Sequence, residues 1–534
     1  MKVLAVLAAA QFLMVLDQAV MNVSISQLVE DFDTDVTSIQ AVITLYSLVM
    51  AALMIAGGKL GDIMGRRRAF GIGNVIYGAG SLLTAVSWSV PVLTLGWSVL
   101  EGIGAALVLP ALAALTARSF EGQQRAFAYG VLGGVAGAGI AVGPILGGWV
   151  TTYLSWRVVF AGEVVVVAVI LLCLRMLPED RGREGAELDK VGAVLSAAGL
   201  AAIVLAVLNA STWGWLEPRD SPIEPFGFSL TPFLIAAGIG VLAVFRVWQR
   251  RREAQDREPL IHLRLLRVAP LRAGLSMFGF QNLILMGIFF SIPLYLQIVQ
   301  GLDAFETGVR MLPVSVTLFV FALLGSRLSR RFAPRAIVRV GVLLLVASSL
   351  MLLGTIEPEI DTTSFAIAMA TLGVGMGLVV SQLGNVVQSA VGEADRGEAG
   401  GLQYTAQQLG ASMGTALIGA IVISGLVASF AADVESSPHI SAEVKQEVGV
   451  RLEGNVSFVS TRQLRSAAEE AGVSDAEADE LVAHYADSQL FALKTGLLVV
   501  ALLSAAAFLF TRNLPARAGP AGEPEGPPPV HALA

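Results

Sequence analysis

The sequence predicts an all-α integral membrane protein with 14 transmembrane helices, arranged as two six-helix bundles with two further helices inserted between them. Its composition gives the class, because 55% of the 534 residues are hydrophobic and 14% are charged, whereas soluble domains carry roughly 25% charged residues. A membrane span needs about 20 mainly apolar residues. The 14 segments that meet this rule lie at 4–26, 38–57, 70–88, 91–115, 127–150, 158–177, 191–209, 231–248, 272–299, 307–326, 336–355, 364–389, 402–430 and 489–511.

The distribution of cations predicts a plasma-membrane protein with both termini in the cytoplasm. Cytoplasmic loops carry an excess of Lys and Arg. With both termini inside, the inner segments hold all but eight of the 35 Lys and Arg residues. Those eight are Arg157, Arg219, Arg310, Lys445, Arg451, Arg462, Arg465 and Lys494. The first apolar segment has no small-residue cleavage site, so we expect a retained span rather than a signal peptide.

The spans group into three units along the chain. Residues 1–180 hold six spans and residues 260–512 hold another six. Between them, residues 181–259 hold the two inserted spans and their basic linkers. Transport folds are commonly built from repeated bundles that hold a substrate near the membrane midplane.

Two polar segments fall outside the spans. Residues 431–488 form an acidic loop that is too polar to cross a membrane, and it lies on the extracytoplasmic side in this topology. Within it, the spacing of Ser474 and Glu477 is typical of a capping box and predicts the start of a short helix. Residues 513–534 are rich in Pro, Gly and Ala, which predicts a disordered cytoplasmic tail.

A charged turn follows the second span. Gly58–Arg68, GKLGDIMGRRR, places four cations and one carboxylate within eleven residues, so it is expected at the membrane surface. Asp62 lies four residues before Arg66, a helical spacing that allows an ion pair. A basic inner loop is also a general topology signal. The pattern resembles the loop between helices 2 and 3 of the major facilitator superfamily, and this resemblance implies that the Asp and Arg latch a cytoplasmic gate. The residues of this gate motif are Gly58, Gly61, Asp62, Gly65 and Arg66.

Three acids lie well inside spans of the first unit: Asp17, Glu101 and Glu163. A carboxylate inside a span costs about 2.5–3.5 kcal/mol on insertion scales, so it normally faces a bundle interior or an aqueous cavity. Each could alternatively be a hydrogen-bonded structural acid. Glu163 is only a few residues inside its span, so an interfacial position is at least as consistent with the sequence.

The strings around two of these acids extend the resemblance. Leu16–Val23 is similar to the helix 1 motif of the fourteen-helix drug/proton antiporters, with Ala19 where a Thr is usual. In the fourth span, Ser98 stands where that family has an Arg connected with proton handling, and Glu101 stands where it has a Gln. The resemblance therefore implies a proton-coupled carrier, although the missing Arg departs from the usual coupling scheme of the family. From their burial we expect Asp17 and Glu101 to be the coupling acids, with Glu163 as the third candidate.

A glycine-rich string lies in the fifth span. Glycines four residues apart form a face on which another helix can pack closely. The full string resembles G-x-x-x-G-P-x-x-G-G, the motif that in this superfamily accompanies antiporters. Its residues are Gly139, Gly143, Pro144, Gly147 and Gly148.

Amides and two aromatic residues supply a candidate substrate cavity. Amides in membranes also tie helices together without lining a cavity. The candidates are Gln18, Asn22, Trp97, Gln281, Asn282, Gln382, Asn385, Gln403, Tyr404 and Gln407.

Together these features predict a monomeric efflux protein that exports organic, amphipathic molecules against the inward proton gradient, with no cofactor. The sequence contains no nucleotide-phosphate loop, metal-spaced cluster or nucleophile elbow, so it supports neither an ATP-driven pump nor an enzyme, and its charge implies nothing about nucleic acid. Because acids are the only ionisable groups well inside the spans, cationic and neutral substrates are expected. The alternatives are proton-coupled uptake, dedicated export of one metabolite or antibiotic, and a non-transporting membrane scaffold or sensor.

Overall fold

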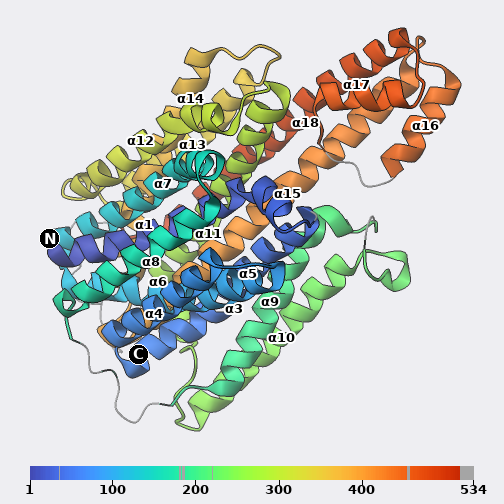
Figure 1. Ribbon diagram of the computed structural model, residues 1–534. Coiled ribbons are helices and arrows are strands. Elements are labelled where there is room, and N and C mark those ends of the chain that lie inside the picture. Colours follow the sequence, from blue (N-terminus) through green and yellow to red (C-terminus); the bar gives the residue numbers. More distant parts are fainter. Residues whose placement is uncertain (35, 180–181, 183–186, 219–220, 454–457, 517–534) are drawn as a thin grey trace, which may run out of the picture.

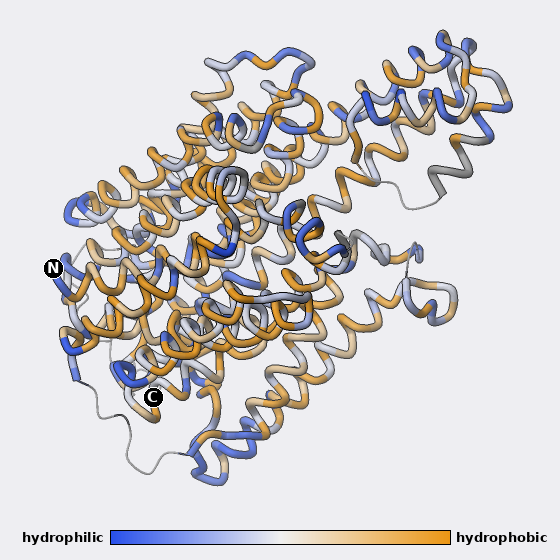
Figure 2. Tube along the Cα trace, in the orientation of Figure 1, coloured by the Kyte–Doolittle hydropathy of each residue, from blue (hydrophilic) through white to orange (hydrophobic). Residues whose placement is uncertain are grey.

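The computed structural model describes residues 1–516 except 35, 180–181, 183–186, 219–220 and 454–457. All regular secondary structure in this part of the chain is helical (Figure 1). Apolar residues dominate the long parallel helices, whereas hydrophilic residues gather at their ends and in the projecting segments (Figure 2). This pattern is the one expected of a protein whose helices cross a membrane.

The first bundle is built from residues before 173. Its long helices are α1 (Lys2–Val23), α3 (Val36–Met64), α4 (Arg66–Ala85), α6 (Gly102–Ser119), α7 (Gly122–Tyr153) and α8 (Trp156–Leu172). Short α2 (Ile25–Asp31) follows α1, while α5 (Val90–Leu93) and the π-helix η1 (Thr94–Glu101) lead directly into α6.

The second bundle begins at residue 269. Its helices are α11 (Ala269–Leu294), extended by the π-helix η5 (Tyr295–Val299), then α12 (Ala304–Leu328), α13 (Pro334–Thr355), α14 (Thr362–Ser389), α15 (Arg396–Ser436) and α18 (Asp475–Phe510).

The number of spans agrees with the predicted architecture. Among the described residues, 13 helical segments are long and apolar enough to cross a membrane. The predicted span at 70–88 corresponds to α4, which has 20 residues, a length sufficient for a crossing. Its mean hydropathy is low because it begins with three arginines and buries Asn74, Ser81 and Thr84 against the bundle.

The inserted pair, α9 (Lys190–Trp213) and α10 (Leu230–Ala254), covers the seam between the bundles. Helix α9 packs against both α3 and α15, with α10 outside it (Figure 1). A small apolar core fixes this position through Ile55 of α3, Leu200 of α9, Phe245 of α10 and the linker residues Leu260 and Ile261.

The predicted loop at 431–488 is largely helical. Helices α15 and α18 continue past the bundle into this region, and α16 (Ala442–Glu453) and α17 (Thr461–Glu470) lie between them, as the projection at the upper right of Figure 1 shows. The Ser474 hydroxyl caps α18, as predicted, but this helix is 36 residues long rather than short. No Gly or Pro interrupts the sequence between Asp475 and the apolar run, so the helix continues into the last span. Residues 517–534 of the predicted tail lie outside the described residues.

The charged turn is shorter than the motif suggests. Helix α3 continues to Met64 and α4 begins at Arg66, so Gly65 alone joins them, with a φ of 94°. A positive φ favours glycine, which lacks the Cβ that would clash. Lys59 and Asp62 consequently stand on the last turns of α3, facing the second bundle.

Candidate functional site

A cavity of about 660 Å³ lies between the two bundles. Its wall is mainly apolar, with aromatic and methionine side chains from α1, α3, η1, α11 and α15. No charged residue is among the described residues that line it. Because methionine side chains adapt to many shapes and aromatic rings offer flat apolar surface, this wall suits varied amphipathic molecules.

Most of the predicted cavity residues line this cavity: Gln18, Trp97, Gln281, Asn282, Gln403, Tyr404 and Gln407. Gln382 and Asn385 do not. The Gln382 amide donates to the Gly325 carbonyl at 2.9 Å and so ties α14 to α12, while Asn385 accepts from the Ser389 hydroxyl at 3.3 Å. These two amides face neighbouring backbone and side chains instead of the cavity. The side chain of Asn22 is not among those described.

Three further amides line the cavity beside the candidates named above. Gln11, Gln297 and Gln408 contribute amides to the wall. The Tyr404 hydroxyl donates to Gln11 Oε1 at 3.0 Å, which links α15 to α1 across the two bundles. A signal for Gln11 was present, because it shares a helical face with Gln18.

Two stacked rings form the part of the wall nearest the buried acids. The rings of Tyr46 and Trp97 lie 4.4 Å apart at an angle of 11°, and both residues line the cavity. The Trp97 indole N–H donates to Asp17 Oδ1 at 2.8 Å. Asp17 therefore lies behind this aromatic pair, one hydrogen bond away from the cavity wall.

The three predicted acids meet in one cluster. Asp17, Glu101 and Glu163 are 0%, 0% and 2% exposed, and an oxygen of each lies within 4.8 Å of an oxygen of the other two. We call these three residues the acid triad. The Thr84 hydroxyl donates to Glu101 Oε1 at 3.2 Å, and the Ser81 hydroxyl donates to Glu163 Oε2 at 3.1 Å.

Glu163 lies deeper than its place in the sequence suggested. Helix α8 buries Trp156, Phe160, Glu163, Val167 and Ile170, which are spaced by three or four residues and so share one face. The carboxyl group consequently points into the bundle rather than to the interface. That spacing was readable from the sequence and would have predicted the burial.

Glu101 is placed by the geometry of η1, whereas Asp17 lies on α1. The π-helical segment Thr94–Glu101 puts Trp97 at the cavity and Glu101 at the triad. Short π-helical stretches are frequent at functional sites. The Ser98 hydroxyl donates to the Val42 carbonyl at 2.7 Å, so this position ties η1 to α3. In the described part of the chain, no Lys, Arg or His pairs with the triad.

The glycine string of α7 packs against α1. A Cβ at Gly139, Gly143 or Gly147 would press on Val15, Ala19 or Val20, respectively. The close helix approach predicted from this string is therefore present, and the small Ala19 side chain sits against Gly143. The side chain of Pro144 lies outside those described, and Gly148 follows on the same helix.

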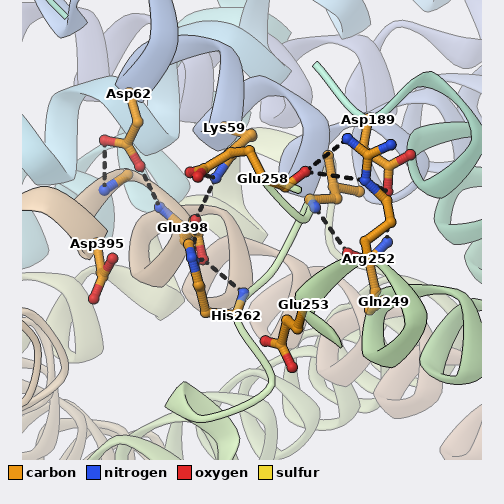
Figure 3. Close-up of polar contacts among 12 residues, drawn as sticks. Lys59, Asp62, Asp189, Gln249, Arg252, Glu253, Glu258, His262, Asp395 and Glu398 are labelled. Atoms are coloured by element: carbon orange, nitrogen blue, oxygen red, sulfur yellow. Dashed lines mark hydrogen bonds and ion pairs between the residues drawn. The ribbon is translucent and has the colours of Figure 1, made fainter. Parts of the chain in front are cut away.

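The gate motif joins the two bundles at the end of α3. Asp62 accepts hydrogen bonds from the backbone N–H groups of Gly397 and Glu398, at 3.2 and 3.1 Å (Figure 3). These N–H groups lie in the first turn of α15 and have no partner within the helix, and a carboxylate is favoured at a helix N-terminus. The predicted pair is also present, because Arg66 donates to Asp62 at 2.9 Å, and it donates to the Glu393 carbonyl as well.

Lys59 supplies a second contact across the same seam. It is 1% exposed, and its ammonium group lies 2.8 Å from both Glu258 and Glu398 (Figure 3). A Cβ at Gly58 would overlap the Gly397 carbonyl, so glycine is required where α3 and α15 approach. The carboxylates of Glu258 and Glu398 offset the desolvation of the buried cation.

The linker between α10 and α11 is a third partner in this network, and the sequence gave no sign of it. The His262 backbone N–H donates to Glu398 Oε2 at 3.0 Å, and its ring Nδ1 lies 3.0 Å from Glu398 Oε1. This contact raises the pKa of His262, although partial burial opposes the shift. Charged His262 therefore strengthens the linker contact at low pH, and the added strength is lost as pH rises through the raised pKa.

Glu258→Gln is expected to loosen this end of the molecule. The reporter is Met54→Cys in a Cys173→Ala background, whose thiol can be alkylated only when this end of the cavity opens. A hydrogen bond to a charged group contributes about 1.5–3 kcal/mol, so its loss should make alkylation about tenfold faster. Met54 is 1% exposed and lines the cavity near Gly401. Glu121→Gln, at an exposed acid, is the matched control. Equal alkylation rates in the reporter protein and in its Glu258→Gln and Glu121→Gln variants would show that the linker does not hold the seam closed.

Comparison with known proteins agrees with this geometry. The family model of the Major Facilitator Superfamily matches residues 7–415. Puromycin resistance protein pur8 of Streptomyces alboniger is 34% identical over 82% of this chain and 84% of its own length. Multidrug efflux pump LfrA of Mycolicibacterium smegmatis is 29% identical over 78% of this chain and 80% of its own.

A solved structure supports the fold. The crystal structure of the human organic anion transporter MFSD10 superposes with a TM-score of 0.59 at 14% identity, covering 96% of this chain and 99% of that one. The family match spans both bundles, the acid triad, the gate motif and most of the cavity. The chain is therefore a multi-pass membrane protein that belongs to the Major Facilitator Superfamily.

Proposed function

We propose that the protein exports amphipathic, cationic or neutral organic compounds across the plasma membrane by alternating access, in exchange for protons. Its relatives include proteins named for puromycin resistance and for multidrug efflux. The observation that carries the coupled mechanism is the acid triad, buried directly behind the Tyr46–Trp97 wall of the cavity.

The arrangement separates substrate binding from proton binding by a single layer of side chains. A flat or cationic substrate stacks on Tyr46 and Trp97, whose π-faces attract cations. Its charge then acts on Asp17, which shares a hydrogen bond with Trp97. Desolvation favours the neutral form of an unpaired carboxylic acid, and an approaching cation favours the ionised form. Substrate arrival therefore releases a proton, and substrate departure allows its return.

The gate contacts of Asp62, Arg66 and Lys59 hold one end of the cavity closed, and we assign that end to the cytoplasm. Both termini then lie in the cytoplasm. We further propose that the protein works as a monomer, draws its energy from the proton gradient alone, without a cofactor, and carries out no enzymatic reaction.

Flux in oriented vesicles tests the direction of transport. Inside-out vesicles that acidify their interior should accumulate a fluorescent lipophilic cation when energised, and a protonophore should abolish the accumulation. Right-side-out vesicles should not accumulate it. Accumulation confined to right-side-out vesicles would establish uptake and overturn the proposal.

The substrate class is expected to follow from charge. One net negative charge attracts a cation by about 4 kcal/mol at about 4 Å and an effective dielectric constant of about 20, and by less across the Tyr46–Trp97 layer. A lipophilic cation should therefore bind roughly tenfold tighter than an uncharged molecule of the same shape. An organic dianion should bind more weakly than either. Competition for the fluorescent cation, measured with such a matched series, checks the order, and tightest binding by the dianion would contradict it.

A further inference from the structure

Each acid of the triad has one bonded oxygen and one without a partner. Trp97, Thr84 and Ser81 donate to one oxygen of Asp17, Glu101 and Glu163, respectively. The other three oxygens, Asp17 Oδ2, Glu101 Oε2 and Glu163 Oε1, are buried and have no hydrogen-bond partner.

Two further buried groups face the same place. The hydroxyls of Tyr46 and Tyr77 are buried beside Asp17, and both interact electrostatically with all three acids. The cluster thus contains three unbonded carboxyl oxygens and two hydroxyl donors, with no base paired to it among the described residues. A buried polar group without a partner is costly, so protons or a nearby cation would stabilise the cluster.

Full ionisation of the triad is excluded by repulsion while the cavity holds no cation. Oxygens of any two of these acids lie within 4.8 Å of each other, so two ionised carboxylates repel strongly even at an effective dielectric constant of about 20. Three carboxylates would add three such repulsions, with no base paired to them among the described residues.

Two protons give the cluster its most favourable state. Two protons shared among the three acids leave a single carboxylate, so the repulsion between ionised groups disappears and two of the unbonded groups become O–H donors. The tyrosine hydroxyls can then stabilise the single negative charge that remains.

The charge of the substrate decides how many of these protons leave. When a monovalent cation binds at the aromatic wall, loss of one proton returns the cluster and substrate together to a net charge of −1. When a divalent cation binds, loss of both protons gives the same net charge. A site with one labile proton could not make the second exchange.

We propose that Asp17, Glu101 and Glu163 form a two-proton site that lets the cavity accept divalent as well as monovalent organic cations, exchanging one proton for each positive charge. The proposal rests on the proposed function, and it adds a substrate class, the divalent organic cations, together with a role for Glu163.

Proton release in detergent, without a membrane, tests the site separately from transport. The solubilised protein is mixed in weakly buffered solution with a mono-quaternary or a bis-quaternary aromatic ammonium compound, and pH change and binding are measured together. About one proton per bound monocation and about two per bound dication are expected from charge matching. Equal release by the two compounds would overturn the proposal, as would failure of the dication to bind.

Variants of Glu163 supply the internal comparison. In Glu163→Gln, release by the dication should fall from about two protons to about one, with its affinity reduced about tenfold, because one labile proton is missing. Glu163→Asp should restore the second proton, and the surface variant Glu121→Gln should release as the parent does. Release of two protons per bound dication in Glu163→Gln would overturn the role of this residue. Release of the same number of protons by Mg²⁺ or Na⁺ alone would overturn the assignment to organic cations. If the solubilised protein releases one proton per monocation and two per dication but vesicles show no export, the proposed function is wrong while the two-proton binding site is supported.

Discussion

Asp62→Asn is expected to abolish export while leaving expression and membrane insertion near those of the parent. Asp62 holds the first turn of α15 through two backbone N–H groups and pairs with Arg66 in a buried position. Removing one partner of a buried ion pair costs about 3–5 kcal/mol, because the remaining charge stays buried and uncompensated. Energised accumulation of a fluorescent cation in inside-out vesicles should fall at least about 100-fold.

The control for this variant is Arg67→Gln. Arg67 is the next residue after Arg66, but its side chain is 22% exposed and it pairs only loosely with Glu179, at 3.7 Å. A surface pair contributes about 0–1 kcal/mol, so export should change little. Undiminished export by Asp62→Asn would limit the motif to setting topology, and equal losses in both variants would show that the loss is not specific to the Asp62 contact.

Asp17→Asn and Glu101→Gln are each expected to remove one of the two protons that are released when a divalent cation binds. Each replacement keeps a polar group of similar shape beside Trp97 or Thr84 but removes a titratable carboxyl from the triad. Because the triad has no base to keep it ionised, protons carried by these acids are the ones a cation displaces. Release per bound dication should fall from about two protons to about one in each variant, and driven export of the dication should fall with it.

Size-exclusion profiles and substrate affinity separate a coupling defect from misfolding. A coupling variant still binds the cation but releases fewer protons, whereas a structural variant loses binding and elutes as aggregate. Glu121→Gln serves again as the surface control. If both Asp17→Asn and Glu101→Gln release protons as the parent does, these acids are structural and coupling lies elsewhere.

The amino-acid sequence by itself determined where the chain is apolar enough to cross a membrane, and therefore the order of the spans. It also determined that Asp17 and Glu101 are buried, since an acid in the middle of an apolar segment has no route to water. The sequence also predicted the Asp62–Arg66 ion pair and the close packing at the glycines of α7. Both depend on the spacing of residues that are near one another in the sequence.

Tertiary structure alone decided which helix faces meet. Gln382 and Gln403 are both amides in long apolar helices, yet only Gln403 lines the cavity, because α14 turns Gln382 toward α12. The three acids lie behind Tyr46 and Trp97 rather than on the cavity wall. Lys59 finds Glu258 and Glu398 in segments 199 and 339 residues away. Hydropathy indicates how far a residue lies from water along its own helix. The hydrogen-bond and ion-pair partners of a buried side chain are instead set by packing between helices that are remote in sequence.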